Sequence, residues 1–169
     1  MTTEAPSKSK VMIARIVILL AVVFIIVGFA WHENSAESRQ RLWQNLIDRP
    51  GGPMKFRFIL QPVMALIAAL HDGIKDARTG RAPYFWTILT NRTDRAGRLS
   101  EGLLSTGRIV LLGLVMDTSY QVIMFKTLYP VETVIVAFLL AFIPYLLMRG
   151  PISRVAHWWL GEAPGGKSP

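Results

Sequence analysis

Three long stretches almost free of charged side chains constrain this chain more than any other feature. Residues 16–31 carry no charge, residues 109–125 carry only Asp117, and residues 133–148 carry none. A helix that crosses a hydrocarbon core of ~30 Å needs about twenty residues, and each stretch reaches that length with its flanking residues. The stretches therefore predict helices that span a membrane.

The composition agrees with a chain that faces lipid. Hydrophobic residues make up 51% of the 169 residues and charged residues 18%, which is too apolar for an ordinary water-coated domain. The absence of cysteine excludes disulfides, thiolate metal sites and a cysteine nucleophile. The sequence predicts an all-α integral membrane protein.

Residues 11–31 are predicted to be an N-terminal transmembrane anchor that follows a polar tail, residues 1–10. The alternative is a cleaved signal peptide, which has a shorter apolar run and ends in small residues. The only small-x-small triplet near the end of this run, Gly28-Phe29-Ala30, is a poor cleavage site. This favours a retained anchor.

Residues 109–148 are predicted to form a transmembrane helical hairpin. Only residues 126–132 separate its two apolar stretches, and such a short connection makes neighbouring helices antiparallel. Pro144 falls inside the second helix, where neighbouring groups tolerate a kink. Residues 149–169 are predicted to be a polar tail.

Residues 54–108 are predicted to be an amphipathic segment that lies at the cytoplasmic membrane surface, separated from the anchor by a polar linker, residues 32–53. The uncharged run 58–70 is short for a span. Its apolar residues recur at helical spacing, which favours a helix in the interface. The apolar stripe is Phe56, Leu60, Val63, Ile67, Leu70, Ile74 and Ala77, and the opposite face carries Gln61, Ala65, Ala68, Asp72 and Lys75. The alternative is that this helix also spans.

The distribution of basic residues predicts the orientation. Basic residues are concentrated between the first and second apolar stretches and after the third, so the positive-inside rule places the outer ends of the hairpin and the C-terminus in the cytoplasm. Three spans then leave the N-terminus outside. Lys8, Lys10 and Arg15 argue for an N-terminus inside, which requires four spans.

Asp117 is the residue that most invites a functional hypothesis. A carboxylate in a membrane helix is costly and usually faces protein or water. Tyr120 and Gln121 share its helix face. One hypothesis is a polar contact between helices, with Asp117 protonated and bonded through Gln121 or to a partner. The other is an ion or proton site.

The net charge of +8 indicates contact with anionic lipids or an acidic partner rather than nucleic acid, because no basic stripe lies on a soluble domain. Arg92, Arg95 and Arg98 recur every three residues and share a helix face. The residues predicted to contact lipid headgroups or a partner are Lys75, Arg78, Arg81, Arg92, Arg95 and Arg98.

No pattern in the chain predicts a catalytic set, a metal site or a cofactor. The three histidines lie in separate segments, and no nucleotide-binding glycine pattern occurs. The order Asp-Gly…Ala-Arg in residues 72–78 suggests the metal motif of phosphoalcohol-transferring membrane enzymes, but the spacing differs and the downstream aspartates are missing.

Three segments resemble a group of small bacterial inner-membrane proteins over about residues 54–154. They are the run MKFRFILQP at 54–62, Asp72-Gly73 with Asp76-Ala77-Arg78, and RAPYFW at 81–86, followed by a hairpin that ends YLLMRGP at 145–151. The resemblance implies a bacterial inner membrane and supplies no catalytic residue.

These observations predict a non-enzymatic accessory or scaffold subunit that associates with another membrane protein or with itself. Two helices and an anchor bury little of their own surface, so partner contacts are expected. The alternative is a small oligomeric ion or proton channel or transporter that uses Asp117.

Overall fold

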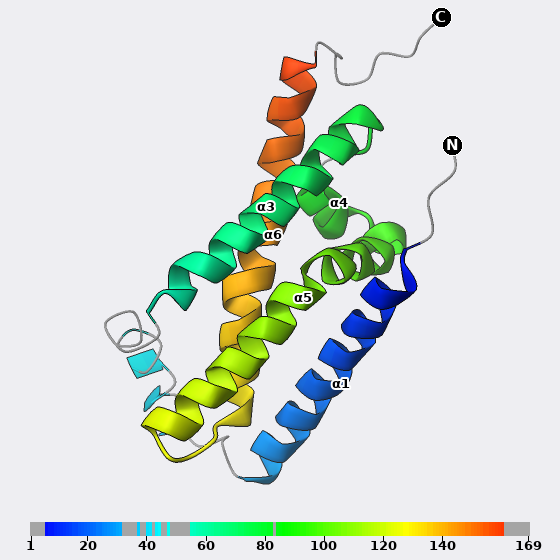
Figure 1. Cartoon of the computed structure of the whole chain (residues 1–169). Coiled ribbons are helices and arrows are strands. Elements are labelled where there is room, and N and C mark those ends of the chain that lie inside the picture. The colour runs from blue at the N-terminus through cyan, green and yellow to red at the C-terminus, as the bar shows by residue number, and fades with distance from the viewer. Residues whose placement is uncertain are drawn as a thin grey trace, which may run out of the picture.

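The computed structural model describes residues 6–31, 55–82 and 84–160, together with residues 37, 40, 41, 43, 44 and 47. Its regular elements in this part of the chain are all helices, which confirms the all-α class (Figure 1). The helices are α1 (Lys8–Ala30), α3 (Arg57–Arg78), α4 (Tyr84–Thr90), α5 (Arg92–Met124) and α6 (Pro130–Trp159).

Four of these helices, α1, α3, α5 and α6, are long and apolar enough to cross a membrane. The sequence predicts three spans, with a fourth through residues 58–70 as the alternative. That stretch belongs to α3, whose 22 residues give a length of ~33 Å. The predicted polar linker and the end of the tail, residues 161–169, lie largely or wholly outside the described residues.

The two hairpin helices extend beyond their apolar stretches. Asn91 caps α5 by accepting hydrogen bonds from the amides of Thr93 (3.1 Å) and Asp94 (3.4 Å), so the helix begins at Arg92 rather than after Arg108. α6 begins at Pro130 and continues to Trp159. The first eleven residues of the predicted tail are therefore helical, and charged side chains at both helix ends find partners inside the bundle.

α1 lies along the hairpin and contacts both α5 and α6 (Figure 1). Its buried residues are small or β-branched and include Ala14, Val17 and Ala21. Their spacing of three and four places them on one helix face. The other faces of α1 expose large apolar side chains such as Leu19 and Ile26.

α3 packs most extensively against α6 and also contacts α5. Arg57 at its start contacts Asp117, near the end of α5 that leads into the hairpin connection. Asp76 near its end contacts Arg149, in the C-terminal half of α6. α3 therefore runs beside the hairpin, parallel to α6 and antiparallel to α5 (Figure 1).

In a helix at the surface of a water-soluble protein, the apolar face is buried and the polar face is exposed. In α3 the apolar face is exposed and the polar face is buried. The predicted apolar stripe points out of the bundle, with Ile67 61% exposed and Leu70 49% exposed. Ala77, predicted in the stripe, is instead buried, and Lys75, predicted on the opposite face, is exposed. The buried face consists of small and polar residues: Arg57, Gln61, Ala65, Ala69, Gly73, Asp76 and Ala77. Small and polar residues are typical of contacts between helices in membranes, because lipid satisfies apolar side chains as well as protein does.

Candidate functional site: two buried charged clusters

Asp117 and its neighbours form the first cluster of buried polar side chains, here called the Asp117 cluster. Its members are Arg57 and Gln61 of α3 and Asp117, Tyr120 and Gln121 of α5. An Nη2 atom of Arg57 lies 2.7 Å from Oδ1 of Asp117. The two side chains are 2% and 0% exposed, so a full ion pair is held inside the bundle.

Gln121 continues this cluster toward the hairpin connection. Its Nε2 donates to Oδ2 of Asp117 at 2.8 Å, and its Oε1 accepts from the Tyr129 amide at 2.6 Å. The spacing of one helical turn between Asp117 and Gln121 makes the first bond possible. Gln121 therefore links Asp117 to the residue that precedes α6.

Arg57 is the member of the cluster that sequence reasoning missed. One hypothesis from the sequence is a protonated Asp117, because the apolar residues 133–148 of the second hairpin helix include no basic residue. The structure supplies the positive charge from α3 instead. The Arg57 guanidinium also lies 4.9 Å from the centroid of the Tyr120 ring, a distance suited to a cation–π contact.

Gln61 stands out within the Asp117 cluster. It is 1% exposed, and neither its Oε1 nor its Nε2 has a hydrogen-bond partner among the described residues. A Cβ added to Gly113 would lie 3.2 Å from this Nε2, so the glycine leaves room for the amide. A buried amide without partners is rare and marks a place where water or an ion could bind.

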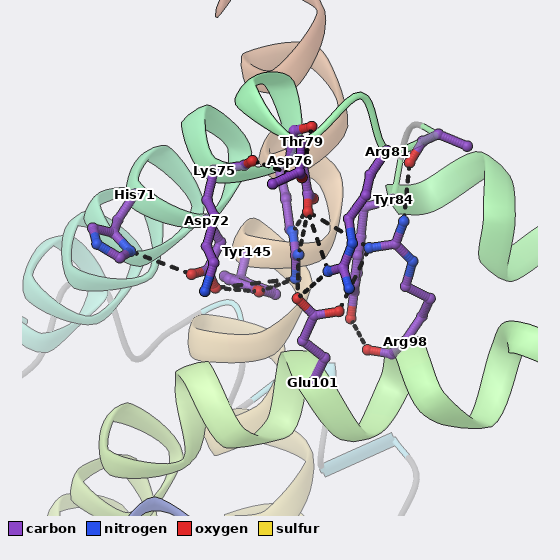
Figure 2. Close-up of polar contacts among 12 residues, drawn as sticks. His71, Asp72, Lys75, Asp76, Thr79, Arg81, Tyr84, Arg98, Glu101 and Tyr145 are labelled. Carbon is purple, nitrogen blue, oxygen red and sulfur yellow. Dashed lines mark hydrogen bonds and ion pairs between the residues drawn. The ribbon is translucent and has the colours of Figure 1, made fainter. Parts of the chain in front are cut away.

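The second cluster lies at the opposite end of α3 and is here called the Asp76 cluster (Figure 2). It contains three carboxylates and three arginines, so its formal charge is zero. The carboxylates are Asp72, Asp76 and Glu101, and the arginines are Arg81, Arg98 and Arg149. Tyr84 and Tyr145 complete it.

Arg149 is the centre of the Asp76 cluster. Its Nε and Nη2 donate to the two carboxylate oxygens of Asp76 at 2.7 and 3.0 Å, and Nη2 also donates to Glu101 at 2.7 Å. Such two-pronged arginine–carboxylate contacts are among the stronger hydrogen bonds in proteins. Arg149 thereby ties α3, α5 and α6 together while it is 1% exposed.

Two tyrosines extend the Arg149 contacts. Arg149 Nη1 donates to the Tyr145 hydroxyl at 2.6 Å, and that hydroxyl donates to Asp72 at 2.7 Å. The Arg149 guanidinium lies 4.2 Å from the centroid of the Tyr84 ring. The four-residue spacing between Asp72 and Asp76, and between Tyr145 and Arg149, places each pair on one helix face.

Tyr84 anchors the short helix α4 to the bundle. Its hydroxyl donates to the Arg98 carbonyl oxygen at 2.5 Å. Burial raises the pKa of Tyr84 to about 12, and the negative charge of Glu101 adds to this rise while Arg149 and Arg98 oppose it. The hydroxyl therefore stays protonated and keeps its donor role at physiological pH.

The residues predicted to contact lipid headgroups divide into two groups. Arg81 and Arg98 bind carboxylates of the Asp76 cluster, and Arg95 donates from Nε to the Ile88 carbonyl at 2.7 Å. These three hold α4 and its flanking turns against α5. Lys75, Arg78 and Arg92 are exposed and form no side-chain hydrogen bond or ion pair within the described part of the chain.

An apolar layer separates the two charged clusters. The buried residues at this level of α3, α5 and α6 include Ala65, Ala69, Val110, Leu114, Ala137 and Ala141. Thr106 lies near the Asp76 cluster, and its hydroxyl donates to the Gly102 carbonyl of its own helix at 2.8 Å. Among the described residues, no group of three or more histidine and acidic side chains is placed to hold a metal ion.

Comparison of the chain with protein-family models, with curated proteins and with solved structures found no match.

Proposed function

We propose that this protein is a non-enzymatic membrane subunit that crosses the membrane four times and acts as a scaffold for another membrane protein or for copies of itself. The observation that carries the proposal is the internal neutralisation of the charges within the two clusters. Asp117 is paired with Arg57, and the three arginines of the Asp76 cluster face three carboxylates. The polar side chains that suggest chemistry in the sequence thus hold helices together.

The packing of α3 supports four spans over three. Its small and polar face contacts protein and its apolar stripe points outward, as expected for a helix surrounded by lipid. Its length beside α6 places its start near the hairpin connection and its end near Arg149. An interfacial helix would instead turn its polar face to water.

Four spans satisfy the preference of Lys8, Lys10 and Arg15 for an N-terminus inside. With four helices the start of α1 and the end of α6 lie at the same end of the bundle (Figure 1). Lys8, Lys10 and Arg154 then lie on the same side as the end of α3 and the start of α5. The positive-inside rule assigns that side to the cytoplasm.

The outer faces of the bundle supply the surface for a partner. α1, α3, α5 and α6 all expose large apolar residues, including Leu19, Ile67, Val115 and Leu147. Lipid or another membrane helix satisfies such faces equally well. A scaffold uses part of this surface for protein contact.

A photocrosslinking experiment tests the scaffold role. A photoreactive residue is placed at Leu19 or Ile67, which point outward from α1 and α3, and membranes are irradiated in the cell. We expect a discrete covalent protein adduct, either a homodimer or one partner, from at least one face. Adducts to lipid alone from outward positions on α1, α3, α5 and α6 would contradict the scaffold role.

The second candidate function, ion or proton transfer through Asp117, is favoured by one observation: the buried amide of Gln61 beside the ion pair has no hydrogen-bond partner among the described residues. The apolar layer between the clusters argues against a path through a single chain. We expect purified protein in liposomes to show no proton or cation flux. A pH-dependent flux that Asp117→Asn abolishes, and that Asp94→Asn leaves intact, would establish the transport function instead.

A further inference from the structure

A groove between the C-terminal parts of α3 and α6 is the feature of the described structure best suited to a ligand. It encloses a cavity of about 470 Å³, within the ~300–1,000 Å³ range of ligand pockets. Leu70, Ile74 and Arg78 line it from α3, and Val155, Ala156 and Trp159 are among the residues that line it from α6.

The groove exists because the two helices touch closely at one point and then separate. A Cβ added to Gly73 would lie 2.8 Å from Cγ2 of Ile152 and 3.1 Å from the Arg149 carbonyl oxygen. Only glycine allows this approach without displacement of a neighbour. Beyond the contact the C-terminal ends of α3 and α6 diverge (Figure 1).

The groove is apolar along its length and cationic at one end. Leu70, Ile74 and Arg78 follow one another at four-residue spacing, so they form a single row along α3 that ends in the arginine. The Arg78 side chain is exposed and forms no hydrogen bond or ion pair with any described residue. Lys75 adds a second exposed cation one turn away on α3.

We propose that this groove binds an anionic membrane phospholipid, with one acyl chain along the apolar row and the phosphate on Arg78. The proposal rests on the membrane-spanning part of the proposed function. In that orientation Arg78 lies at the cytoplasmic end of α3, where anionic headgroups are concentrated. Trp158 and Trp159, 81% and 83% exposed, lie at the same end of α6, and tryptophan is enriched at headgroup level.

Charge complementarity distinguishes this occupant from others. A neutral phospholipid would fill the apolar row equally well. Its binding free energy would be less favourable, because a headgroup without net charge is attracted less strongly to the Arg78 guanidinium. A partner helix would bury the Arg78 charge and would need to supply a carboxylate. An anionic lipid can contact both parts of the groove at once. Its acyl chain lies along Leu70 and Ile74 while its phosphate binds Arg78.

Fluorescence quenching tests this proposal. Trp159 is kept as the single tryptophan by changing Trp31, Trp43, Trp86 and Trp158 to phenylalanine, and the protein is reconstituted in phosphatidylcholine vesicles. Phosphatidylglycerol or phosphatidylcholine with brominated acyl chains is then added in increasing proportion. We expect brominated phosphatidylglycerol to quench Trp159 at a mole fraction about fivefold lower, the size of one arginine contact with an anionic headgroup.

Three variants assign the effect to the groove. Arg78→Gln should remove the preference for phosphatidylglycerol, and Ala156→Phe should fill the groove and weaken quenching by the anionic lipid. Arg154→Gln is the matched control, because Arg154 is an equally exposed arginine of α6 that does not line the groove. Its preference should equal that of the unsubstituted protein.

Equal quenching by both lipids, or a preference that survives Arg78→Gln, would overturn the lipid site. So would a Trp159 that no brominated lipid quenches, because a second copy of the chain would then cover the groove. The topology of single-cysteine variants in the same vesicles is measured separately by thiol labelling. A protein that spans four times without lipid preference refutes the site alone, whereas a protein that does not span refutes both proposals.

Discussion

Arg57 and Asp117 each bury a full charge, and each is tolerated because the other lies 2.7 Å away. Removal of a single charge from water costs several kcal/mol, and a close opposite charge returns most of that cost. Substitution of one member of the pair should therefore destabilise the fold strongly, whereas substitution of both members should destabilise it less. A structural ion pair therefore shows a strong coupling between the two substitutions in the free energy of unfolding, which a transport site that depends only on the titration of Asp117 does not require.

The first prediction is a double-mutant cycle on this pair. Asp117→Asn leaves Arg57 without its 2.7 Å carboxylate and should lower the free energy of unfolding in detergent by about 3 kcal/mol, as for other buried pairs broken on one side. Arg57→Gln should cost a similar amount. The double variant Arg57→Gln/Asp117→Asn should be more stable than the sum of the two losses predicts, and simple additivity would argue against a structural pair.

The second prediction concerns Gly102, where the hydroxyl of Tyr84 occupies the space of a Cβ. Gly102→Ala should displace this hydroxyl, break its bond to the Arg98 carbonyl and lower the melting temperature. Tyr84→Phe removes the hydroxyl and should restore part of the loss. Gly97→Ala is the control, because nothing lies within 4 Å of a Cβ there and alanine should stabilise the helix by about 0.5–1 kcal/mol. Equal effects at Gly102 and Gly97 would contradict the contact.

At the scale of elements, the amphipathic pattern of α3 identifies its two faces but not what each face meets. The same stripe fits a helix at the membrane surface and a helix that packs its polar side against protein. The local pattern therefore predicted the helix and left its placement open. The long apolar runs of α1, α5 and α6 have no such ambiguity, and these helices were expected from the sequence.

The partners of the buried charges could not be predicted for a related reason. Asp76 and Arg149 are 73 residues apart, and apolar periodicity carries no information about which distant helices meet. The spacing of Asp72 with Asp76, and of Tyr145 with Arg149, is a signal that sequence reasoning could have used. Two polar pairs at four-residue spacing near the ends of apolar helices indicate polar faces that need a partner.

The third prediction tests the contact between α3 and α6. Gly73→Ala places a methyl group against Cγ2 of Ile152 and should loosen this crossing, which weakens the Asp76–Arg149 contact on the same faces. The expected result is a lower melting temperature in detergent, partly restored by Ile152→Ala because that change removes Cγ2. Failure of Ile152→Ala to restore any stability would show that the steric contact is not the cause.

At the scale of the whole molecule, the two charged clusters lie at different levels of the helix bundle. The Asp76 cluster lies at the end of the bundle that carries the start of α1 and the end of α6, and the Asp117 cluster lies toward the hairpin connection (Figure 1). An apolar layer between them fits a rigid bundle rather than a conducting one. The proposed four-span topology requires that α3 cross the membrane.

Thiol accessibility in sealed membranes tests that requirement most directly. The chain contains no cysteine, so single cysteines at Ser38, before α3, and Ser100, in α5, can be labelled without background. A four-span protein places these positions on opposite sides, and an impermeant thiol reagent outside intact cells should label Ser38→Cys and spare Ser100→Cys until the membrane is opened. Protection of both positions in intact cells, followed by labelling of both on opening, would place residues 38–100 on one side and contradict the four-span bundle.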